Sequence, residues 1–257
     1  MSVDATAIRL LSAWLMEARR GVAFTGAGIS TESGIPDFRS PGGVWSKTTP
    51  VYFQDFLADP DERQRYWEMR RLSVPSFLSA KPNAGHAVLA ALESGGALCA
   101  VVTQNIDELH QRAGSRRVLE IHGTAMKVHC IECDKRWPCE VIQRRSELGE
   151  TDFRCDECGG LLKSMTVSFG QEMLPGVWME ARQFARHADL MLAIGSSLVV
   201  YPAAELPQIA RQHGARLVII NRDPTPFDEI ADLVIHAGIG QTLTAVADQC
   251  GIQIPSC

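Results

Sequence analysis

The sequence predicts an α/β protein, with a parallel sheet covered by helices and a small cysteine-rich module inserted between its two halves. Three observations predict this class. Short apolar runs alternate with helical patterns, these runs are apolar at both alternating positions, and one polar region rich in cysteine interrupts the alternation. A chain of 257 residues is long enough for one large domain and one small module.

Six short apolar runs are the predicted strands. Both faces of each run are apolar, which is typical of strands that helices cover on both sides. The runs are Val22–Thr25, Leu98–Thr103, Val118–Ile121, Leu190–Ile194, Leu217–Ile220 and Leu233–Ile235.

Helical patterns connect the predicted strands. The first, Ala7–Arg20, places Ile8, Leu11 and Leu15 on one face, as in an amphipathic helix that packs on a core. The other predicted helices are Pro60–Leu72, Asn83–Glu93, Val177–His187, Ala203–His213 and Gly240–Gln249.

Two regions depart from this alternation. Residues 127–163 are polar and charged, so we predict that they form a module inserted between residues 1–126 and 164–257 of the sheet domain. A second irregular region, residues 36–61, follows the first glycine turn. So long a connection in a compact domain predicts a flexible ligand-binding loop or a lid.

Composition and charge narrow the class of partners. The formal net charge of −5 gives no basic footprint, so we expect no direct nucleic-acid partner. No secretory signal is visible, and the longest uncharged stretch, Leu190–Ala204, is short and broken by glycine and proline. We therefore expect no membrane span and a cytoplasmic location.

Four of the eight cysteines form two Cys-x-x-Cys pairs, Cys130 with Cys133 and Cys155 with Cys158. Each pair can present two thiolates from a turn, and two such turns close a tetrahedron around one zinc ion. Four cysteine ligands leave no open position for water. The spacing therefore predicts a structural zinc and not a catalytic one.

A Gly-x-Gly turn follows the first predicted strand, at Gly26, Ala27 and Gly28. Glycines at such a place let backbone amides approach a phosphate closely. The usual dinucleotide fingerprint has a third glycine where this chain has Thr31, and an acidic residue after a second strand where this chain has a loop. The turn therefore indicates a nucleotide site only weakly, and an ordinary strand-to-helix turn stays the alternative.

Polar side chains also follow the second predicted strand, where Gln104, Asn105 and Asp107 come directly after Leu98–Thr103. Ligands of open parallel sheets gather at the carboxyl ends of strands, which favours a binding or catalytic role for these residues. The alternative is a helix cap, which asparagine and aspartate also make.

His122 follows the third predicted strand. An unperturbed histidine titrates near neutral pH and can act as a general base. His129 adjoins Cys130, but four cysteines already fill the metal site. The remaining histidines are assigned structural roles by default, and they are His86, His110, His187, His213 and His236.

Further polar positions are weak signals when each is taken alone. A small glycine-serine turn and a strand-end asparagine suit a ribose and a phosphate, and an aromatic between an acid and an arginine suits a loop that covers a ligand. Ordinary turns and loop packing are the alternatives. The positions are Gly195, Ser196, Ser197, Asn221, Asp37, Phe38 and Arg39.

Taken together and in this order, the motifs resemble the sirtuin family, and the match covers nearly the whole chain. The segments Leu161–Gln171 and Val200–Ala204 are similar to sirtuins of actinobacteria in particular. The motifs that carry the resemblance are Gly26–Ser30, Gly34–Ser40, Thr103–His110, Leu119–Gly123, the four cysteines, Phe169–Gly170, Gly195–Leu198 and Asn221.

The resemblance implies a Rossmann-like NAD-binding domain, a small zinc-ribbon domain with one structural zinc ion, and a cleft between them. It also implies an NAD orientation inverted relative to dehydrogenases, which agrees with the missing third glycine. The residues that the family pattern assigns to NAD are Gly26, Ala27, Gly28, Thr31, Asp37, Phe38, Arg39, Gln104, Ile106, Gly195, Ser196, Ser197, Asn221 and Ile239.

The activity that the resemblance implies is NAD-dependent deacylation of protein lysine, with transfer of the acyl group to ADP-ribose and release of nicotinamide. His122 is then the general base that takes a proton from the ribose hydroxyls. Asn105 and Asp107 are expected to position the nicotinamide carboxamide and a water. Phe38 is expected to shield the reactive sugar from bulk water, and Arg39 to contact phosphate or order the loop.

Acyl-lysine proteins or peptides are the partners that the resemblance implies. The peptide is expected to add as a strand between two loops, around Phe169–Gln171 and Val199–Pro202. The residues assigned to it are Val167, Phe169, Gly170, Val199 and Tyr201.

Some positions depart from the commoner family pattern. Glu108 stands where many members have glycine, Gln171 where many have glutamate, and Ser196 where threonine is frequent. Members that remove succinyl or malonyl groups have a Tyr-x-x-Arg pair, whereas this chain has Trp67 and Arg70 in the comparable stretch. The missing tyrosine predicts a preference for uncharged acyl groups, acetyl first.

Three other functions stay open at this point. Mono-ADP-ribosyl transfer to a protein uses the same cleavage of NAD with another nucleophile. A zinc-ribbon adaptor would bind NAD or nucleic acid without turnover, but the negative charge and the polar strand ends count against it. A hydride-transferring dehydrogenase is disfavoured by the incomplete glycine fingerprint.

Overall fold

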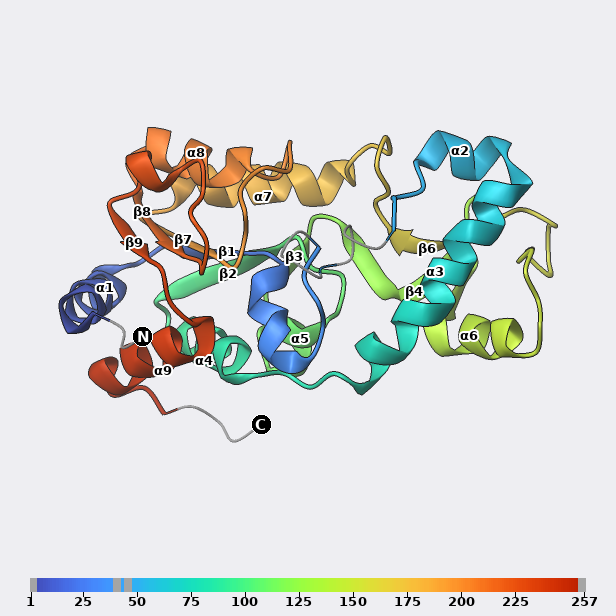
Figure 1. The fold of residues 1–257 in the computed structure, drawn as a ribbon. Helices are drawn as coiled ribbons and strands as arrows, with labels where there is room; N and C mark the ends of the chain where they lie inside the picture. Colours follow the sequence, from blue (N-terminus) through green and yellow to red (C-terminus); the bar gives the residue numbers. More distant parts are fainter. Residues whose placement is uncertain (1–3, 39–42, 44–47, 254–257) are drawn as a thin grey trace.

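A six-stranded sheet forms the larger part of the computed structural model, which describes residues 4–38, 43 and 48–253 (Figure 1). The strands are β1 (Gly21–Thr25), β2 (Leu98–Thr103), β3 (Val118–Glu120), β7 (Leu190–Ile194), β8 (Arg216–Ile220) and β9 (Leu233–Ile235). Neighbouring strands are parallel and follow the order β3-β2-β1-β7-β8-β9. The fold class and all six predicted strands are confirmed. The order reverses between β1 and β7, the place where open α/β sheets bind ligands.

Helices cover both faces of this sheet (Figure 1). One face carries α1 (Ala5–Glu17), α4 (Ala84–Ser94) and α9 (Ile239–Cys250), and the other carries α7 (Pro175–His187) and α8 (Glu205–Gln212). Alternate residues of β7 enter the two cores, because Leu192 packs in the first while Met191 and Ala193 pack in the second. Burial on both faces explains why the strand sequences are continuously apolar.

The start of α4 is tied to the turn that follows β1. Asn83 Oδ1 accepts from the Gly85 amide at 2.9 Å, and the Asn83 amide donates to His86 Nδ1 at 3.3 Å, which completes a capping box. Asn83 Nδ2 also donates to the Ile29 carbonyl at 2.7 Å, within the 3-10 helix η1 (Ala27–Ser33). One cap, worth about 1 kcal/mol, therefore also fixes the segment after β1.

A second sheet of three antiparallel strands, in the order β5-β4-β6, lies beside the first (Figure 1). Trp67 packs on Phe153 with ring centroids 4.7 Å apart, and Phe56 packs on Tyr66 at 4.9 Å, so this unit has its own core. Its elements are β4 (Gly123–Cys130), β5 (Arg136–Pro138), β6 (Leu162–Thr166), α6 (Cys139–Glu147), α2 (Phe53–Ala58) and α3 (Pro60–Ser79).

Sequence and structure differ mainly in this second unit. The sequence predicts no regular element within residues 36–61, yet α2 forms there, because a helix of six residues is too short to show a period. Helix α3 continues beyond Leu72 and through Pro75, since Val74 and Phe77 become buried in that stretch. The limits 127–163 of the metal-binding module stay a prediction, while the sheet itself begins at Gly123 and ends at Thr166.

Two short helices complete the described elements, α5 (Leu109–Arg112) after β2 and η3 (Asp228–Ile230) before β9. Among the described residues, no helix combines the length and the apolar character needed to cross a membrane. Polar side chains gather at the strand ends of the first sheet and at its junction with the second sheet.

Candidate active site

Two glycine turns meet at the carboxyl ends of β1 and β7. The Gly28 amide donates to the Gly195 carbonyl at 2.9 Å, and the Gly26 amide donates to the Ile194 carbonyl at 3.0 Å. A Cβ atom added at Gly28 would lie 2.7 Å from the Gly195 Cα atom, so a larger residue would push the turns apart. Gly195 has a φ of +62°, a conformation that favours glycine. The glycines thus bring both turns together where the strand order reverses.

Ser30, Asn105 and Asp107 form a buried polar cluster that we call the strand-end cluster. Ser30 Oγ donates to Asp107 Oδ2 at 2.7 Å and accepts from Asn105 Nδ2 at 3.1 Å. Asp107 Oδ1 accepts from the Leu109 amide at 3.0 Å, at the start of α5. Burial raises the pKa of Asp107, although the hydrogen bonds from Ser30 and Leu109 oppose this rise. Asp107 therefore both holds the start of α5 and belongs to the cluster.

Two buried histidines support the strand-end cluster. His86 Nε2 lies 3.5 Å from Ser30 Oγ, and the His86 and His110 rings pack with centroids 4.8 Å apart. His110 Nε2 lies 2.9 Å from Thr25 Oγ1, at the end of β1. Burial lowers the pKa of His86 to about 4 and places that of His110 well below its ordinary value. Both lowered pKa values favour neutral rings at pH 7, so the cluster is supported without an added charge.

The His122 ring is held by the chain segment that carries Asn105. Its Nδ1 atom lies 3.0 Å from the Gln104 carbonyl, and a carbonyl only accepts, so Nδ1 carries the proton. The neutral ring then has Nε2 free to accept a proton. Burial lowers the pKa of His122 below 6.5, and the hydrogen bond to Gln104 opposes this effect. The ring is therefore suited to act as a general base at neutral pH.

Polar side chains also lie at the ends of β2, β7 and β8. Gln104 Nε2 donates to Ser196 Oγ at 2.8 Å, which joins the end of β2 to the turn after β7. Asn221 follows β8, and its Nδ2 donates to the Asp223 carbonyl at 2.7 Å. His236 Nδ1 lies 3.0 Å from the Asn221 carbonyl, so a histidine with a default structural assignment supports this strand end.

The other described residues assigned to NAD come mainly from the two glycine turns and from the segments that follow β1 and β2. Ala27 and Ser197 are half-buried in the two glycine turns, and the exposed Thr31 donates through its hydroxyl to the Gly28 carbonyl at 2.9 Å. The remaining positions are Ile106, whose carbonyl accepts from the Ala125 amide, the buried Ile239 at the start of α9, the half-buried Asp37 and Phe38, and Arg39, which lies outside the described residues.

The residues assigned to the peptide lie on two exposed segments. The Val167 amide donates to the His122 carbonyl at 2.8 Å, so the first segment starts beside the candidate base. Phe169, Val199 and Tyr201 are all exposed large side chains. The Val199 and Tyr201 amides make no backbone hydrogen bond to another described residue. Amides of this kind suit a peptide that adds as a strand.

Sequence reasoning missed Ser30 and Tyr52 as site residues. Ser30 lies inside the recognised glycine motif, but its central place in the cluster depends on three segments that only the fold brings together. The Tyr52 ring lies 6.0 Å from that of Phe169, and a Cβ atom at Gly170 would lie 3.7 Å from it. Tyr52 is 52% exposed and precedes α2, which the sequence pattern did not reveal.

The four paired cysteines come together in the second unit. Their sulfur atoms lie within 4.8 Å of one another, with Cys130 and Cys158 at 3.5 Å and Cys133 and Cys155 at 3.7 Å. A tetrahedron with zinc–sulfur bonds of about 2.3 Å has edges of about 3.8 Å, so the cluster fits one zinc ion. A Cβ atom at Gly160 would lie 2.9 Å from Cys130 Sγ, which explains glycine in this turn.

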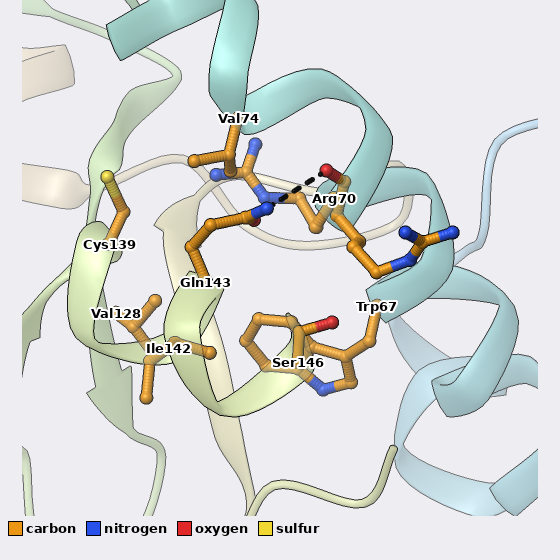
Figure 2. A pocket seen from close by; sticks show the side chains of 9 residues that line it. Trp67, Arg70, Val74, Val128, Cys139, Ile142, Gln143 and Ser146 are labelled. Atoms are coloured by element: carbon orange, nitrogen blue, oxygen red, sulfur yellow. Dashed lines mark hydrogen bonds between the residues drawn. The ribbon is translucent and has the colours of Figure 1, made fainter. Parts of the chain in front are cut away.

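A cavity between α3 and α6 is too small to be a ligand site (Figure 2). Its volume is about 10 Å³, which is room for roughly one water molecule. Trp67, Arg70, Cys139 and Gln143 are among the side chains around it (Figure 2). This cavity is therefore not a candidate for the ligand site.

Together, the parallel sheet with glycine turns at its switch point and the four-cysteine module define a class of nucleotide-binding α/β proteins with a zinc-ribbon unit. The Sir2 family model matches residues 26–202. An NAD-dependent protein deacetylase of Rhodopseudomonas palustris is 49% identical over 224 residues, 86% of this chain and 88% of that protein. The chain therefore belongs to the Sir2 family, the sirtuins.

Two further comparisons give the same family. NAD-dependent protein deacetylase 2 of Streptomyces coelicolor is 46% identical over 228 residues, 86% of this chain and 94% of that protein. A solved Sir2 structure with a p53 peptide and NAD⁺ superposes with a TM-score of 0.88 at 40% identity, covering 96% of this chain and 99% of that one. The Streptomyces protein is no more similar than the Rhodopseudomonas protein, so the actinobacterial subtype stays a prediction.

Proposed function

We propose that this protein is an NAD-dependent protein lysine deacylase, with acetyl-lysine as its first substrate. The observation that carries the proposal is the His122 ring, held by the Gln104 carbonyl at 3.0 Å so that Nε2 accepts a proton beside the strand-end cluster. The names of the relatives, NAD-dependent protein deacetylases, and the peptide and NAD⁺ of the solved Sir2 structure support it.

The residues around the crevice suit a bound dinucleotide. The glycines at positions 26 and 28 leave room for a phosphate to approach the backbone of this turn closely. Ser196 and Asn221 lie at neighbouring strand ends, where hydroxyl and amide groups suit the adenosine ribose. Asp37 and Phe38 precede residues outside the described part, and with Arg39 they keep the proposed role of covering the cofactor.

Bound NAD supplies an electrophilic ribose carbon with nicotinamide as the leaving group. In the proposed mechanism, His122 Nε2 takes a proton from a ribose hydroxyl, which makes that oxygen a better nucleophile toward the acyl carbon. Asn105 and Asp107 orient the nicotinamide end and a water. Their positions are fixed through Ser30, which bonds both. The acyl-lysine oxygen would displace nicotinamide from the ribose carbon and one water would be consumed, so acyl-lysine, NAD and water would give free lysine, nicotinamide and acyl-ADP-ribose.

The peptide would add its backbone to the two exposed segments, Val167–Gly170 and Val199–Tyr201. Backbone pairing accepts many sequences, while the acyl-lysine must reach His122, next to which Val167 is bonded. The exposed rings of Tyr52 and Phe169 suit an apolar side chain of the peptide near the acyl-lysine. The substrate is therefore proposed to be an extended, accessible segment of protein.

The acyl preference follows from the state of Arg70. Its guanidinium donates to the Ala125 carbonyl at 2.8 Å and packs against the Phe77 ring. A distal carboxylate such as that of succinyl-lysine would need this charge, which is already engaged, and it would lack a tyrosine partner. We propose that acetyl and propionyl groups are preferred.

The four-cysteine cluster is proposed to hold zinc in a structural role. Four thiolates complete the tetrahedron, so no position remains for water or substrate. Paired thiolates that hold metal suit a reducing compartment, which supports the proposed cytoplasmic location.

An acyl-peptide panel with NAD tests the proposed function. Acetyl, propionyl and succinyl versions of one peptide are each incubated with the zinc-loaded protein, and nicotinamide, acyl-ADP-ribose and free lysine are measured. We expect equal amounts of the three products for acetyl-lysine and at least tenfold less for succinyl-lysine. Label from NAD on protein, without free lysine, would instead identify an ADP-ribosyltransferase.

A further inference from the structure

Lys163 is a fully buried lysine at the junction between the two units. It lies in β6 with 0% exposure, and no acidic side chain pairs with it among the described residues. Its ammonium donates to the Thr166 carbonyl at 2.5 Å and to the Ser164 carbonyl at 3.4 Å. The rings of Phe53 and Tyr66 lie over it, with centroids 5.7 and 5.9 Å away. Backbone oxygens and aromatic faces thus take the place of a counter-ion.

The carbonyls that Lys163 binds lie where the pairing of β4 with β6 is irregular. Ser164 pairs with Val128 and Thr166 pairs with Gly123, so β4 advances five residues while β6 advances two. A regular ladder would fix both strands by itself. Here the ammonium bridges the irregular stretch of β6 from the side, and it fixes the direction in which the chain leaves Thr166.

The chain that leaves Thr166 is the segment proposed to bind the peptide. Val167 follows at once, and its amide donates to the His122 carbonyl at 2.8 Å. The Phe53 amide donates to the Phe169 carbonyl at 2.9 Å, while the Phe53 ring covers the Lys163 ammonium. Lys163 therefore holds the start of the segment, beside the candidate base His122. Phe53 holds its other end, at the exposed Phe169.

The charge of Lys163 is unfavourable for stability where it lies. Burial, together with the nearby Arg70 charge, lowers the pKa of Lys163 to about 7. A methionine of similar length would fill the same space between Phe53 and Tyr66 without a charge. Methionine cannot donate to the two carbonyls. The contribution of Lys163 is therefore to the geometry of the backbone at Ser164 and Thr166.

We propose that Lys163 is a positioning residue that fixes the peptide-binding segment, residues 167–170, relative to His122. This inference rests on the proposed deacylase function. The lysine touches neither the cofactor crevice residues nor the exposed face of the segment, and it acts through the Thr166 carbonyl. It therefore governs the binding of acyl-peptide and leaves that of NAD unchanged.

The test compares Lys163→Met, Lys163→Arg and the control Lys81→Met with the wild type, each as the full-length zinc-loaded protein. Lys81 is an exposed lysine before α4. We expect Lys163→Met to raise the KM for acetyl-peptide about tenfold, with the KM for NAD within twofold and kcat at saturating peptide within threefold. Lys163→Arg should restore most of the peptide KM, since it can still donate to carbonyls, and Lys81→Met should match the wild type.

Three results would overturn the inference. They are an unchanged peptide KM in a folded Lys163→Met protein, a parallel rise in both KM values, and a failure of arginine to improve on methionine. If Lys163→Met does not fold, Phe53→Leu replaces it as the test. We expect Phe53→Leu to raise the KM for acetyl-peptide about threefold and to leave the KM for NAD unchanged. An unchanged KM for acetyl-peptide in this variant would contradict the inference. A wild type that forms no acyl-ADP-ribose overturns the proposed function, whereas an active wild type with unaffected variants overturns only this inference.

Discussion

Two buried polar regions of the molecule, the strand-end cluster and the junction between the sheets, differ in charge. At the strand ends, burial lowers the pKa values of His110 and His122 and raises that of Asp107. All three shifts favour the neutral form of the group. Neutral donors and acceptors keep their hydrogen-bonding capacity without a fixed charge, which suits a site that transfers protons and receives a charged cofactor.

The second unit and its junction instead hold three basic side chains, of which Arg63 and Lys163 are buried and Arg70 is half-buried. Arg63 donates to the Phe56 and Leu57 carbonyls at 3.1 and 3.0 Å, Arg70 donates to the Ala125 carbonyl, and Lys163 donates to the Thr166 carbonyl. None of the three cations has a carboxylate partner among the described residues. A carbonyl belongs to the backbone, so each cation fixes the course of the chain.

The difference teaches that buried polar groups serve different purposes in the two regions. At the strand ends, burial shifts the pKa values of the polar groups, and removing these groups should affect turnover most. At the junction, the polar groups fix the position of the backbone, and removing them should affect binding or stability. Substitutions in each region can break this division.

Replacing His122 by alanine should have the largest effect. Loss of the proton acceptor should lower kcat for acetyl-peptide by about 10²–10⁴-fold, the usual contribution of a positioned base. Binding of NAD, measured by calorimetry, should stay within a few-fold, because the ring is not assigned to the phosphates or adenosine. His213→Ala, an exposed histidine after α8, is the matched control and should match the wild type. Near-normal turnover in His122→Ala would refute the base assignment.

Replacing Cys130 by serine should have the next largest effect, on stability. The variant loses one of four thiolates, so we expect loss of bound zinc and destabilisation of the second unit by on the order of 3 kcal/mol or more, about 10 °C in Tm. Zinc content and thermal unfolding measure both. Cys250→Ser, a half-buried cysteine outside the cluster, should keep its zinc and its Tm within about 2 °C. A Cys130→Ser protein with full zinc would contradict the structural role.

Two members of the strand-end cluster and His122 could be predicted from the sequence because they follow recognisable strands, whereas the place of Ser30 in the cluster could not. Asn105, Asp107 and His122 each come directly after an apolar run, and topology alone places such positions at one edge of a parallel sheet. The spacing of the cysteines fixed the metal site in the same way, since two local turns suffice to form it.

The junction could not be predicted, because no local pattern marks it. Arg63 and Arg70 belong to a polar helix, α3, in which nothing distinguishes a buried arginine from an exposed one. The burial of Lys163 depends on Phe53 and Tyr66, which reach it from about a hundred residues earlier in the chain. Long-range contacts of this kind have no period in the sequence.

The Lys163 ammonium should also make the stability of the protein depend on pH above neutrality. Its pKa is about 7 in the folded protein against 10.5 as the ordinary value, so between these values the unfolded state binds more protons. The unfolding free energy of the wild type should therefore rise with pH in this window. Relative to Lys163→Met, the rise should be about 2 kcal/mol between pH 7 and pH 9.

Urea unfolding of both zinc-loaded proteins at pH 7, 8 and 9 measures this difference. Taking the difference cancels all groups that the two proteins share, including the cysteines. Parallel curves across the three pH values would mean that Lys163 titrates normally, and the contrast between the two buried regions would then fail at the junction.

The smallest predicted effect is the position of the acid limb of turnover. A general base works in its neutral form, so activity should be lost as pH falls through the pKa of His122. Because burial lowers that pKa below 6.5, kcat/KM for acetyl-peptide should still exceed half its plateau at pH 6.5. Measuring kcat/KM from pH 5 to pH 8 locates the limb.

Asp107 is the other group in the strand-end cluster whose protonation changes on the acid side. Burial raises the pKa of Asp107, so this carboxyl group titrates closer to the pH range of the His122 limb than an ordinary aspartate does. Asp107→Asn separates the two groups: the variant should have lower but measurable activity at every pH and keep the limb where the wild type has it. A limb that disappears in Asp107→Asn would assign the titration to the carboxyl group. An apparent pKa above 7 in the wild type would show that a charged neighbour, and not burial, sets the protonation of the His122 imidazole.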